Sequence, residues 1–246
     1  MIKLGYSLGS NKQKYSLKDK IKIISSVETH AVELSYMVID ELKEKPDEED
    51  IELLKKFQYI SIHAPALVYK NQETGEKKWI RYPDDNSQAV IMQLLEIAKK
   101  INANTILFHP DLVDDFSWLA KQIGSLLSFE NMDKNKKFGN NIKDLEKIFS
   151  QAPNAKWVCD VNHIYTVDQS MKLSQKFHDA FGDRLCHYHL SAYGGFHEAF
   201  YISGEDIILQ GIKNFSIPII HEGQALRDGK ESLIKENKYV LERLEK

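Results

Sequence analysis

The stretch Arg184-Leu-Cys-His-Tyr-His-Leu190 is a short, mainly apolar run that carries two histidines, and the pair Gly194-Gly195 follows it. The run predicts a β-strand and the glycine pair predicts a loop. Because side chains alternate along a strand, His187 and His189 face the same side, with His189 nearer the C-terminal end. Histidine is the commonest metal ligand, so the stretch indicates either part of a metal site or scattered surface or hydrogen-bonded histidines.

The same strand-then-helix pattern recurs along the chain. Strands are predicted at residues 2–6, 31–36, 59–63, 105–109, 125–130, 157–160, 184–189 and 217–222. Helices are predicted at residues 17–27, 46–57, 87–101, 114–123, 142–150, 169–181, 204–213 and 230–244. No change of composition marks a linker. Residues 1–246 are therefore expected to form a single (β/α)8 TIM barrel, ahead of an open doubly wound sheet.

Length and composition agree with an ordinary barrel enzyme. The 246 residues match the usual size of a (β/α)8 domain, and the net charge of −3 indicates no global basic field for nucleic acid. No apolar run approaches the ~20 residues that span a bilayer, and the N-terminus lacks a signal-peptide core, so no membrane partner is expected. Two cysteines, Cys159 and Cys186, provide no disulfide framework, which favours a cytoplasmic location.

The ends of the predicted strands three to eight all carry potential metal ligands. In order, these residues are His63, His109, Glu130, Asp160, His189 and Glu222. The C-terminal ends of all strands of a (β/α)8 barrel meet at one rim, so the six side chains are expected to converge. A single acidic residue at a strand end can be only a helix cap or a solvated loop residue. Six consecutive strand ends favour a shared metal site.

Nitrogen and oxygen donors without cysteine suit zinc or manganese, and several histidines favour zinc. His163 follows Asp160 by three residues and can reach the same rim, or it is a surface loop histidine. His187 lies deeper than His189 and is expected to support it or to pack in the core rather than to bind the ion. Glu33, on the second predicted strand, either borders the pocket or is a solvated carboxylate.

These residues resemble motifs of the xylose isomerase-like barrels, a superfamily that includes endonuclease IV and many sugar isomerases and epimerases. The resemblance covers the third to the eighth strand and looks closest to endonuclease IV. The matching segments are His63-Ala-Pro65, His109-Pro110, Glu130-Asn131 with Gly139, Asp160-Val-Asn-His163, His189-Leu190 and His197-Glu198. The resemblance implies a metal-dependent phosphoester hydrolase, with an AP-site phosphodiesterase as the specific case.

Carried over residue by residue, the resemblance implies two zinc sites and the beginning of a third, with Mn²⁺ as the alternative ion. The first ion would be held by His63, His109 and Glu130. The second would be held by Glu130, Asp160, His189 and Glu222. His163 and His197 would begin a third site, which lacks its aspartate because Gly195 stands in that position. The residues expected to take part in the reaction are Glu130, Glu222 and His163.

A sugar or sugar-phosphate isomerase or epimerase is the alternative function. It needs one metal, while Glu130 and Glu222 exchange a carbon-bound proton as general acid and base and His163 binds a substrate oxygen. It does not need the histidines of the third and fourth strands, and their presence favours the hydrolase. No arginine follows His189 closely, as one usually does in the epimerases. A catalytically silent binding barrel is disfavoured because the ligand set is nearly complete.

The predicted loop at residues 64–85 is long, which is typical of functional loops. Its Trp79, Arg81 and Tyr82 are predicted to contact the substrate, with simple anchoring of the loop as the alternative for Trp79 and Tyr82. Lysines of this loop and of residues 131–141 could follow the phosphates of DNA, although solvated loop charge is the simpler interpretation. A phosphoester or sugar-type substrate is expected, and the charge does not support DNA.

Overall fold

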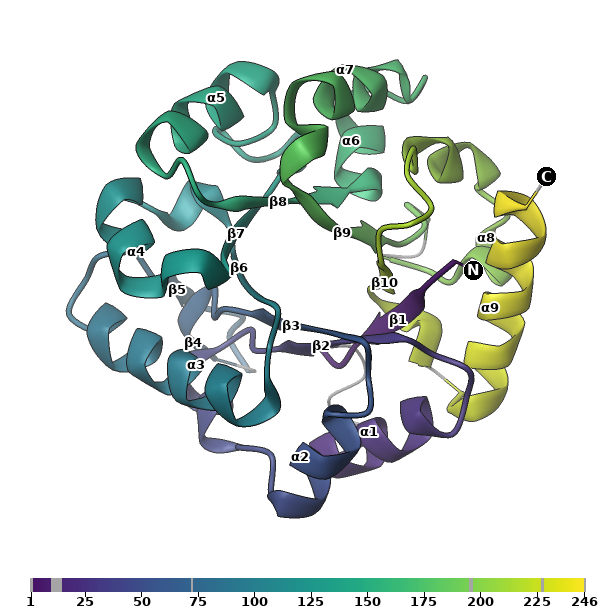
Figure 1. Ribbon diagram of the computed structural model, residues 1–246, viewed down its shortest axis with the longest axis horizontal. Helices are drawn as coiled ribbons and strands as arrows, with labels where there is room; N and C mark the ends of the chain where they lie inside the picture. Colours follow the sequence, from purple (N-terminus) through teal and green to yellow (C-terminus); the bar gives the residue numbers. More distant parts are fainter. Residues whose placement is uncertain (1, 10–14, 72, 195–196, 227, 246) are drawn as a thin grey trace.

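A computed structural model describes residues 2–9, 15–71, 73–194, 197–226 and 228–245 of the chain. In this part of the chain, parallel strands close into an eight-stranded barrel in the order β1-β10-β9-β8-β7-β6-β3-β2 (Figure 1). The strands are β1 (Leu4–Ser7), β2 (Ala31–Ser35), β3 (Tyr59–His63), β6 (Thr105–Phe108), β7 (Leu127–Glu130), β8 (Lys156–Asp160), β9 (Leu185–Leu190) and β10 (Ile219–His221). The predicted TIM barrel is confirmed.

An outer layer of helices surrounds the barrel (Figure 1). The α-helices are α1 (Leu17–Ser25), α2 (Glu48–Leu54), α3 (Ser87–Ile101), α4 (Phe116–Ile123), α5 (Ile142–Gln151), α6 (Val161–Val167), α7 (Lys172–Phe181), α8 (Phe200–Ser203) and α9 (Lys230–Leu244). Short 3-10 segments are η1 (Ile39–Lys43), η2 (Pro110–Leu112), η3 (Gly124–Leu126), η4 (Gly182–Arg184), η5 (Asp206–Gly211) and η6 (Gln224–Leu226). Within the described ranges, no helix has both the length and the apolar character needed to cross a membrane.

The barrel closes through β1, which pairs with β10 on one side and with β2 on the other. Gly5 of β1 lies opposite Ala31 of β2, and a Cβ at position 5 would overlap the carbonyl group of Ala31. Glycine is therefore required where these two backbones approach each other. Between strands and helices the core is apolar, and Trp157, Phe129 and Phe177 are fully buried there.

The segment after β8 differs from the prediction of one helix over residues 169–181, because α6 precedes α7. The Asp160 side chain caps α6 by accepting a hydrogen bond from the backbone N–H of His163. The residues of α6 include several β-branched and aromatic side chains, which have modest helix propensity. Burial of Val161 and Ile164 stabilises the helix instead, and local sequence patterns do not report that contribution.

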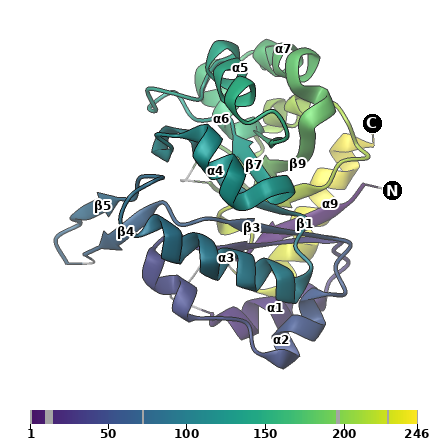
Figure 2. The ribbon, with the colours of Figure 1, turned by 60° about the vertical axis from the view of Figure 1, so that its left-hand side comes forward.

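The predicted loop at residues 64–85 contains a β-hairpin of β4 (Leu67–Lys70) and β5 (Lys77–Trp79). Figure 2 shows this hairpin projecting away from the body of the barrel. All three residues of β5 are exposed, so β5 has no buried alternating face that the sequence could reveal. The hairpin follows β3 and therefore belongs to the rim formed by the C-terminal strand ends.

Candidate metal centre

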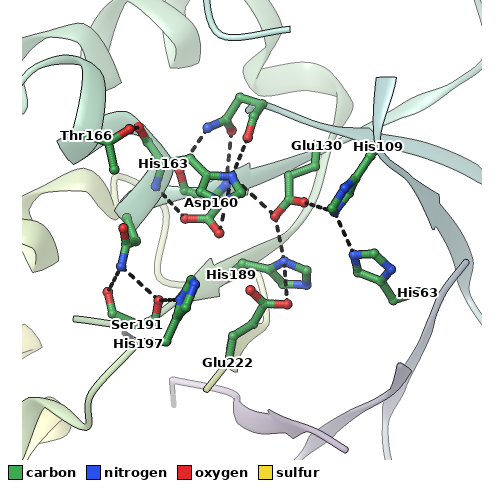
Figure 3. Close-up of polar contacts among 12 residues, drawn as sticks. His63, His109, Glu130, Asp160, His163, Thr166, His189, Ser191, His197 and Glu222 are labelled. Carbon is green, nitrogen blue, oxygen red and sulfur yellow. Dashed lines mark hydrogen bonds and ion pairs between the residues drawn. The ribbon is translucent and has the colours of Figure 1, made fainter. Parts of the chain in front are cut away.

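The six predicted ligands converge at the C-terminal rim of the barrel, as Figure 3 shows. Strands β3, β7 and β8 end at His63, Glu130 and Asp160. His189 is the second-last residue of strand β9. Two further ligands, His109 and Glu222, directly follow β6 and β10. Among the described residues, potential ligand atoms gather in three groups: His63, His109 and Glu130; Glu130, Asp160, His189 and Glu222; and Glu33, His187 and His189.

Glu130 connects the first two groups, because its two carboxylate oxygens face different histidines. Its Oε1 lies 2.8 Å from Nδ1 of His189, and its Oε2 lies 3.3 Å from Nε2 of His109. The residue is only 1% exposed. Burial by itself raises the pKa of Glu130, but the neighbouring His189 and His109 outweigh burial and hold the pKa well below its ordinary value. Glu130 is therefore an ionised carboxylate placed between two sets of donors.

The first group presents two histidine nitrogens to the same point. Nδ1 of His63 lies 2.9 Å from the carbonyl oxygen of Ala64 and can donate its proton there, which leaves Nε2 as the ligand atom. That Nε2 lies 3.0 Å from Nε2 of His109. Burial, and the nearby His109, lower the pKa of His63 to about 4, so the ring is neutral. A neutral imidazole with a bare ring nitrogen is the form of histidine that binds a metal ion.

The second group contains a buried carboxylate oxygen that accepts no hydrogen bond, Oδ2 of Asp160, which lies 3.6 Å from Nδ1 of His163. The other oxygen, Asp160 Oδ1, accepts the His163 N–H at 2.8 Å. Burial raises the pKa of Asp160, with the Glu130 carboxylate adding to the effect. Glu222 Oε1 lies 3.3 Å from His189 Nδ1, and burial together with the other carboxylates raises the Glu222 pKa to about 8.

The donor set fits a divalent cation. A buried carboxylate oxygen without a hydrogen-bond partner is rare, and a bound ion is one of its ordinary explanations. Asp160 Oδ2 is such an atom, and it lies in the group of four ligands around His189. The two groups contain imidazole nitrogens and carboxylate oxygens without cysteine, which suits zinc or manganese.

His163 and His197 lie beside these groups, but neither belongs to any of the three groups found among the described residues. His163 Nδ1 lies 2.8 Å from the carbonyl oxygen of Asn131, an arrangement that leaves Nε2 for a ligand. Burial opposes charge on His163, but Asp160 and Glu130 raise its pKa to about 9. His197 has a left-handed backbone, with φ of 61°, and its Nδ1 lies 2.7 Å from Ser191 Oγ. The third-site position 195 lies outside the described residues.

The three residues predicted to contact substrate have different surroundings. Trp79 is 42% exposed on β5, and the Lys136 ammonium lies 4.6 Å from its ring centre. Arg81 is paired with Asp114. Tyr82 is 1% exposed, and its hydroxyl group donates to the carbonyl oxygen of Pro65. Trp79 is therefore accessible to a substrate, whereas Tyr82 packs in the core, where it anchors the loop.

Glu33 and His187 lie on the side of His189 that faces away from the first two ligand groups, and both are in direct contact with its ring. Glu33 is fully buried, not solvated, and its Oε2 lies 3.0 Å from His189 Nε2. Burial by itself raises the pKa of Glu33, but His189, His63 and His187 lower it to about 2. His187 Nε2 lies 3.2 Å from His189 Nε2. A charged residue between the buried apolar residues of a predicted strand is the signal that points to Glu33.

Comparisons with known proteins identify the fold. No protein-family model matches this chain, and no curated protein matches it either. Among solved structures, a 3-keto-D-glucoside 4-epimerase from E. coli matches with a TM-score of 0.65 and 12% identity, covering 98% of this chain and 100% of that chain. A D-psicose 3-epimerase matches with a TM-score of 0.60 and 14% identity, over 99% and 97% of the two chains.

An AP endonuclease of family 2 from Brucella melitensis matches with a TM-score of 0.59 and 12% identity, over 95% of this chain and 96% of that chain. A protein described as a probable 3-DHS dehydratase from Bacillus anthracis matches with a TM-score of 0.62 and 12% identity, over 98% of this chain and 99% of that chain. At such identities the likeness concerns the fold and not the reaction. The chain has a TIM-barrel fold, which it shares with these epimerases, this dehydratase and this AP endonuclease.

Proposed function

We propose that the protein is a divalent-metal-dependent phosphoester hydrolase with two zinc ions at the barrel rim. The observation that carries this proposal is the orientation of Glu130. One of its oxygens faces His109 in the first ligand group, and the other faces His189 in the second. A carboxylate that contributes one oxygen to each of two donor groups is what a two-metal hydrolytic site requires.

In this proposal His63, His109 and Glu130 hold one ion, and Glu130, Asp160, His189 and Glu222 hold the other. The ions would supply an activated water molecule and positive charge for the phosphoryl oxygens. The hydrogen bond to the Asn131 carbonyl group orients the ring of His163, whose Nε2 is then available for a substrate oxygen. Burial of His63, Glu130, Asp160 and His189 keeps solvent from weakening these interactions.

A small phosphoester suits this rim better than duplex DNA does. A protein that follows a DNA backbone needs several unpaired cations along its track. Two cations on the relevant loops are instead paired with acidic neighbours: Arg81 with Asp114, and Lys136 with Asp111. The net charge of −3 adds no long-range attraction for a polyanion. The exposed ring of Trp79 offers a surface for a base or a sugar next to the centre.

A sugar epimerase is the second candidate function, and the second ligand group favours it. Glu130 and Glu222 both approach the same nitrogen of His189, at 2.8 and 3.3 Å. Two carboxylates at one ion are the acid–base pair that epimerisation at a carbon next to a carbonyl group needs. Two of the solved structures with this fold are named as sugar epimerases. In this alternative, His63 and His109 would have no catalytic task.

Removal of the first ligand group separates the two functions. The experiment measures bound zinc and manganese per chain, and activity on aryl phosphoesters, an abasic duplex and ketoses, for the wild type and for His63→Ala, His109→Ala and Glu130→Gln. The hydrolase predicts two ions in the wild type, one in either histidine variant, and loss of phosphoesterase activity in all three variants. Retained epimerase activity in the histidine variants would instead support the epimerase.

A matched control is His30→Ala, because His30 precedes β2 at the opposite end of the barrel and should change neither metal content nor activity. A wild-type chain that binds no divalent ion, and whose stability is unchanged by a chelator, would contradict both candidate functions.

A further inference from the structure

A chain of buried polar side chains continues below the proposed metal centre, inside the barrel. His189 directs Nδ1 toward Glu130 and Glu222, whereas its Nε2 faces the opposite way, toward Glu33 and His187. Glu33, His187 and His189 are all fully buried. These residues come from β2 and β9, which lie on different sides of the barrel in Figure 1.

The distances leave room for one proton between the two histidine rings. His187 Nε2 and His189 Nε2 are 3.2 Å apart, so only one of these nitrogens can carry a hydrogen toward the other. If Nδ1 of His189 binds an ion, that nitrogen is bare and the ring proton must be on Nε2. His187 Nε2 is then an acceptor, and the proton of His187 is on Nδ1, which lies 2.9 Å from the Tyr59 hydroxyl group.

Glu33 is the better acceptor for the His189 proton. Its Oε2 lies 3.0 Å from His189 Nε2 and 3.7 Å from His187 Nε2. A hydrogen bond to a carboxylate is stronger than one to a neutral imidazole, because the acceptor is charged. Ser61 Oγ donates to the same oxygen at 2.9 Å and fixes the carboxylate. Glu33 therefore selects the tautomer of His189 and, through it, the tautomer of His187.

The formal charge of Glu33 also matches a centre with two ions. With the buried Glu130 and Asp160 and the partly exposed Glu222 it brings four carboxylates together, and their formal charge equals in size that of two divalent cations. Buried charges are costly unless opposite charges compensate them. Removal of Glu33 would leave an excess of positive charge when both ions are bound.

We propose that Glu33 is a positioning residue that accepts the Nε2 proton of His189 and thereby presents Nδ1 of His189 to the metal ion. This inference rests on the proposed metal centre but not on the reaction that the centre catalyses. Glu33 does not have to touch the ion or the substrate. Its effect is on metal affinity and on the coordination of His189.

The test compares zinc affinity in the full chain for the wild type, Glu33→Gln and two control variants, by competition with a chromophoric chelator. Glu33→Gln keeps the side-chain volume and removes the charge. The dissociation constant of the second ion is expected to rise about 10–100-fold, as for other partners of metal-bound histidines. Tyr59→Phe and His30→Ala leave Glu33, its hydrogen bond from Ser61 and His189 in place, and are expected to change this constant by less than about threefold.

Two further measurements distinguish positioning from a general loss of structure. Nitrogen-resolved NMR of the wild-type histidine rings should show zinc at Nδ1 and a proton at Nε2 of His189, and this result does not depend on any variant folding. The visible absorption of the Co²⁺-loaded protein should change in Glu33→Gln, while the circular dichroism of the two proteins stays the same.

Several outcomes would overturn the proposal. The first is zinc bound to Nε2 of His189, and the second is an unchanged zinc affinity in Glu33→Gln. The third is a further equivalent of zinc that is lost in this variant, because Glu33, His187 and His189 would then be a buried ion site. A wild type that binds two ions but hydrolyses no phosphoester would contradict the proposed function and leave this inference intact. A wild type that binds no ion would refute both.

Discussion

Asp160 has two separable tasks, and replacing it by asparagine should remove one of them. Its Oδ1 caps α6 by accepting the His163 N–H, while its buried Oδ2 has no hydrogen-bond partner and lies 3.6 Å from Nδ1 of His163. An asparagine keeps an accepting oxygen for the cap and puts a neutral amide in place of Oδ2. Asp160→Asn should therefore preserve the fold and weaken metal binding, whereas Asp160→Ala should lose both the cap and the ligand.

The expected sizes follow from these contacts. A buried polar atom without a hydrogen-bond partner lowers the stability of the folded state by about 1–3 kcal/mol. Metal-free Asp160→Asn should therefore be as stable as the wild type, or more stable by up to about that amount. Burial raises the pKa of Asp160 in the folded chain, so its ionised form costs stability at pH values above that pKa, and the substitution removes this cost at neutral pH. Asp160→Ala should be less stable than Asp160→Asn by about 0.5–2 kcal/mol, the usual value of a cap.

Zinc should reverse this order. At a free zinc concentration a hundredfold above the dissociation constant, one ion stabilises the wild type by about 2.7 kcal/mol. For a chain of this size each kcal/mol shifts the melting temperature by about 2–4 °C, so a rise of about 5–11 °C is expected in the wild type. The wild type should gain such a rise from each of its two ions, whereas both variants should keep only the rise from the ion held by His63, His109 and Glu130.

Thermal unfolding followed by circular dichroism, with chelator and with zinc, measures all of these values in one experiment. A metal-free Asp160→Asn that is less stable than the wild type by more than about 1 kcal/mol would show that the ion pair of Oδ2 with His163 outweighs the cost of burying it. A wild-type response of Asp160→Asn to zinc would remove Asp160 from the ligand set.

Three other predictions concern residues outside the ligand groups. Gly5→Ala should destabilise the protein by about 1–3 kcal/mol or more in chemical denaturation, because its Cβ would overlap the Ala31 carbonyl group. Glu236→Gln should speed hydrogen exchange at the start of α8, where the carboxylate accepts two backbone N–H groups, and an unchanged rate would contradict that role. Burial lowers the pKa of His178 below 6.5, so the free energy of unfolding should fall as the pH drops below 6.5. His178→Phe should reduce this dependence on pH in a series of chemical denaturations. An equal dependence in the wild type and the variant would refute the role of His178.

The alternation of strands and helices, and the residue types at the strand ends, could be predicted from the sequence. Each strand of a closed parallel barrel is buried and each helix has an apolar face, so both leave a local pattern of period two or 3.6. The helices over residues 87–101 and 230–244 agree with the predictions at both ends. Because the barrel topology puts all C-terminal strand ends on one rim, His63, Glu130 and Asp160 could be assigned to one site before any distance was known.

Only the tertiary structure decided which atoms meet and which residues are enclosed. Helix α6 forms because its apolar side chains are buried, which outweighs modest helix propensity. Glu33 reaches His189 across the interior because closure of the barrel leaves only β1 and β10 between β2 and β9, two strands far apart in the sequence. The two oxygens of Glu130 face different ligand groups because the closed barrel places His109 and His189 on either side of β7. Alternation determines which face of a strand a side chain occupies, but only the curvature of the closed sheet determines what it meets there.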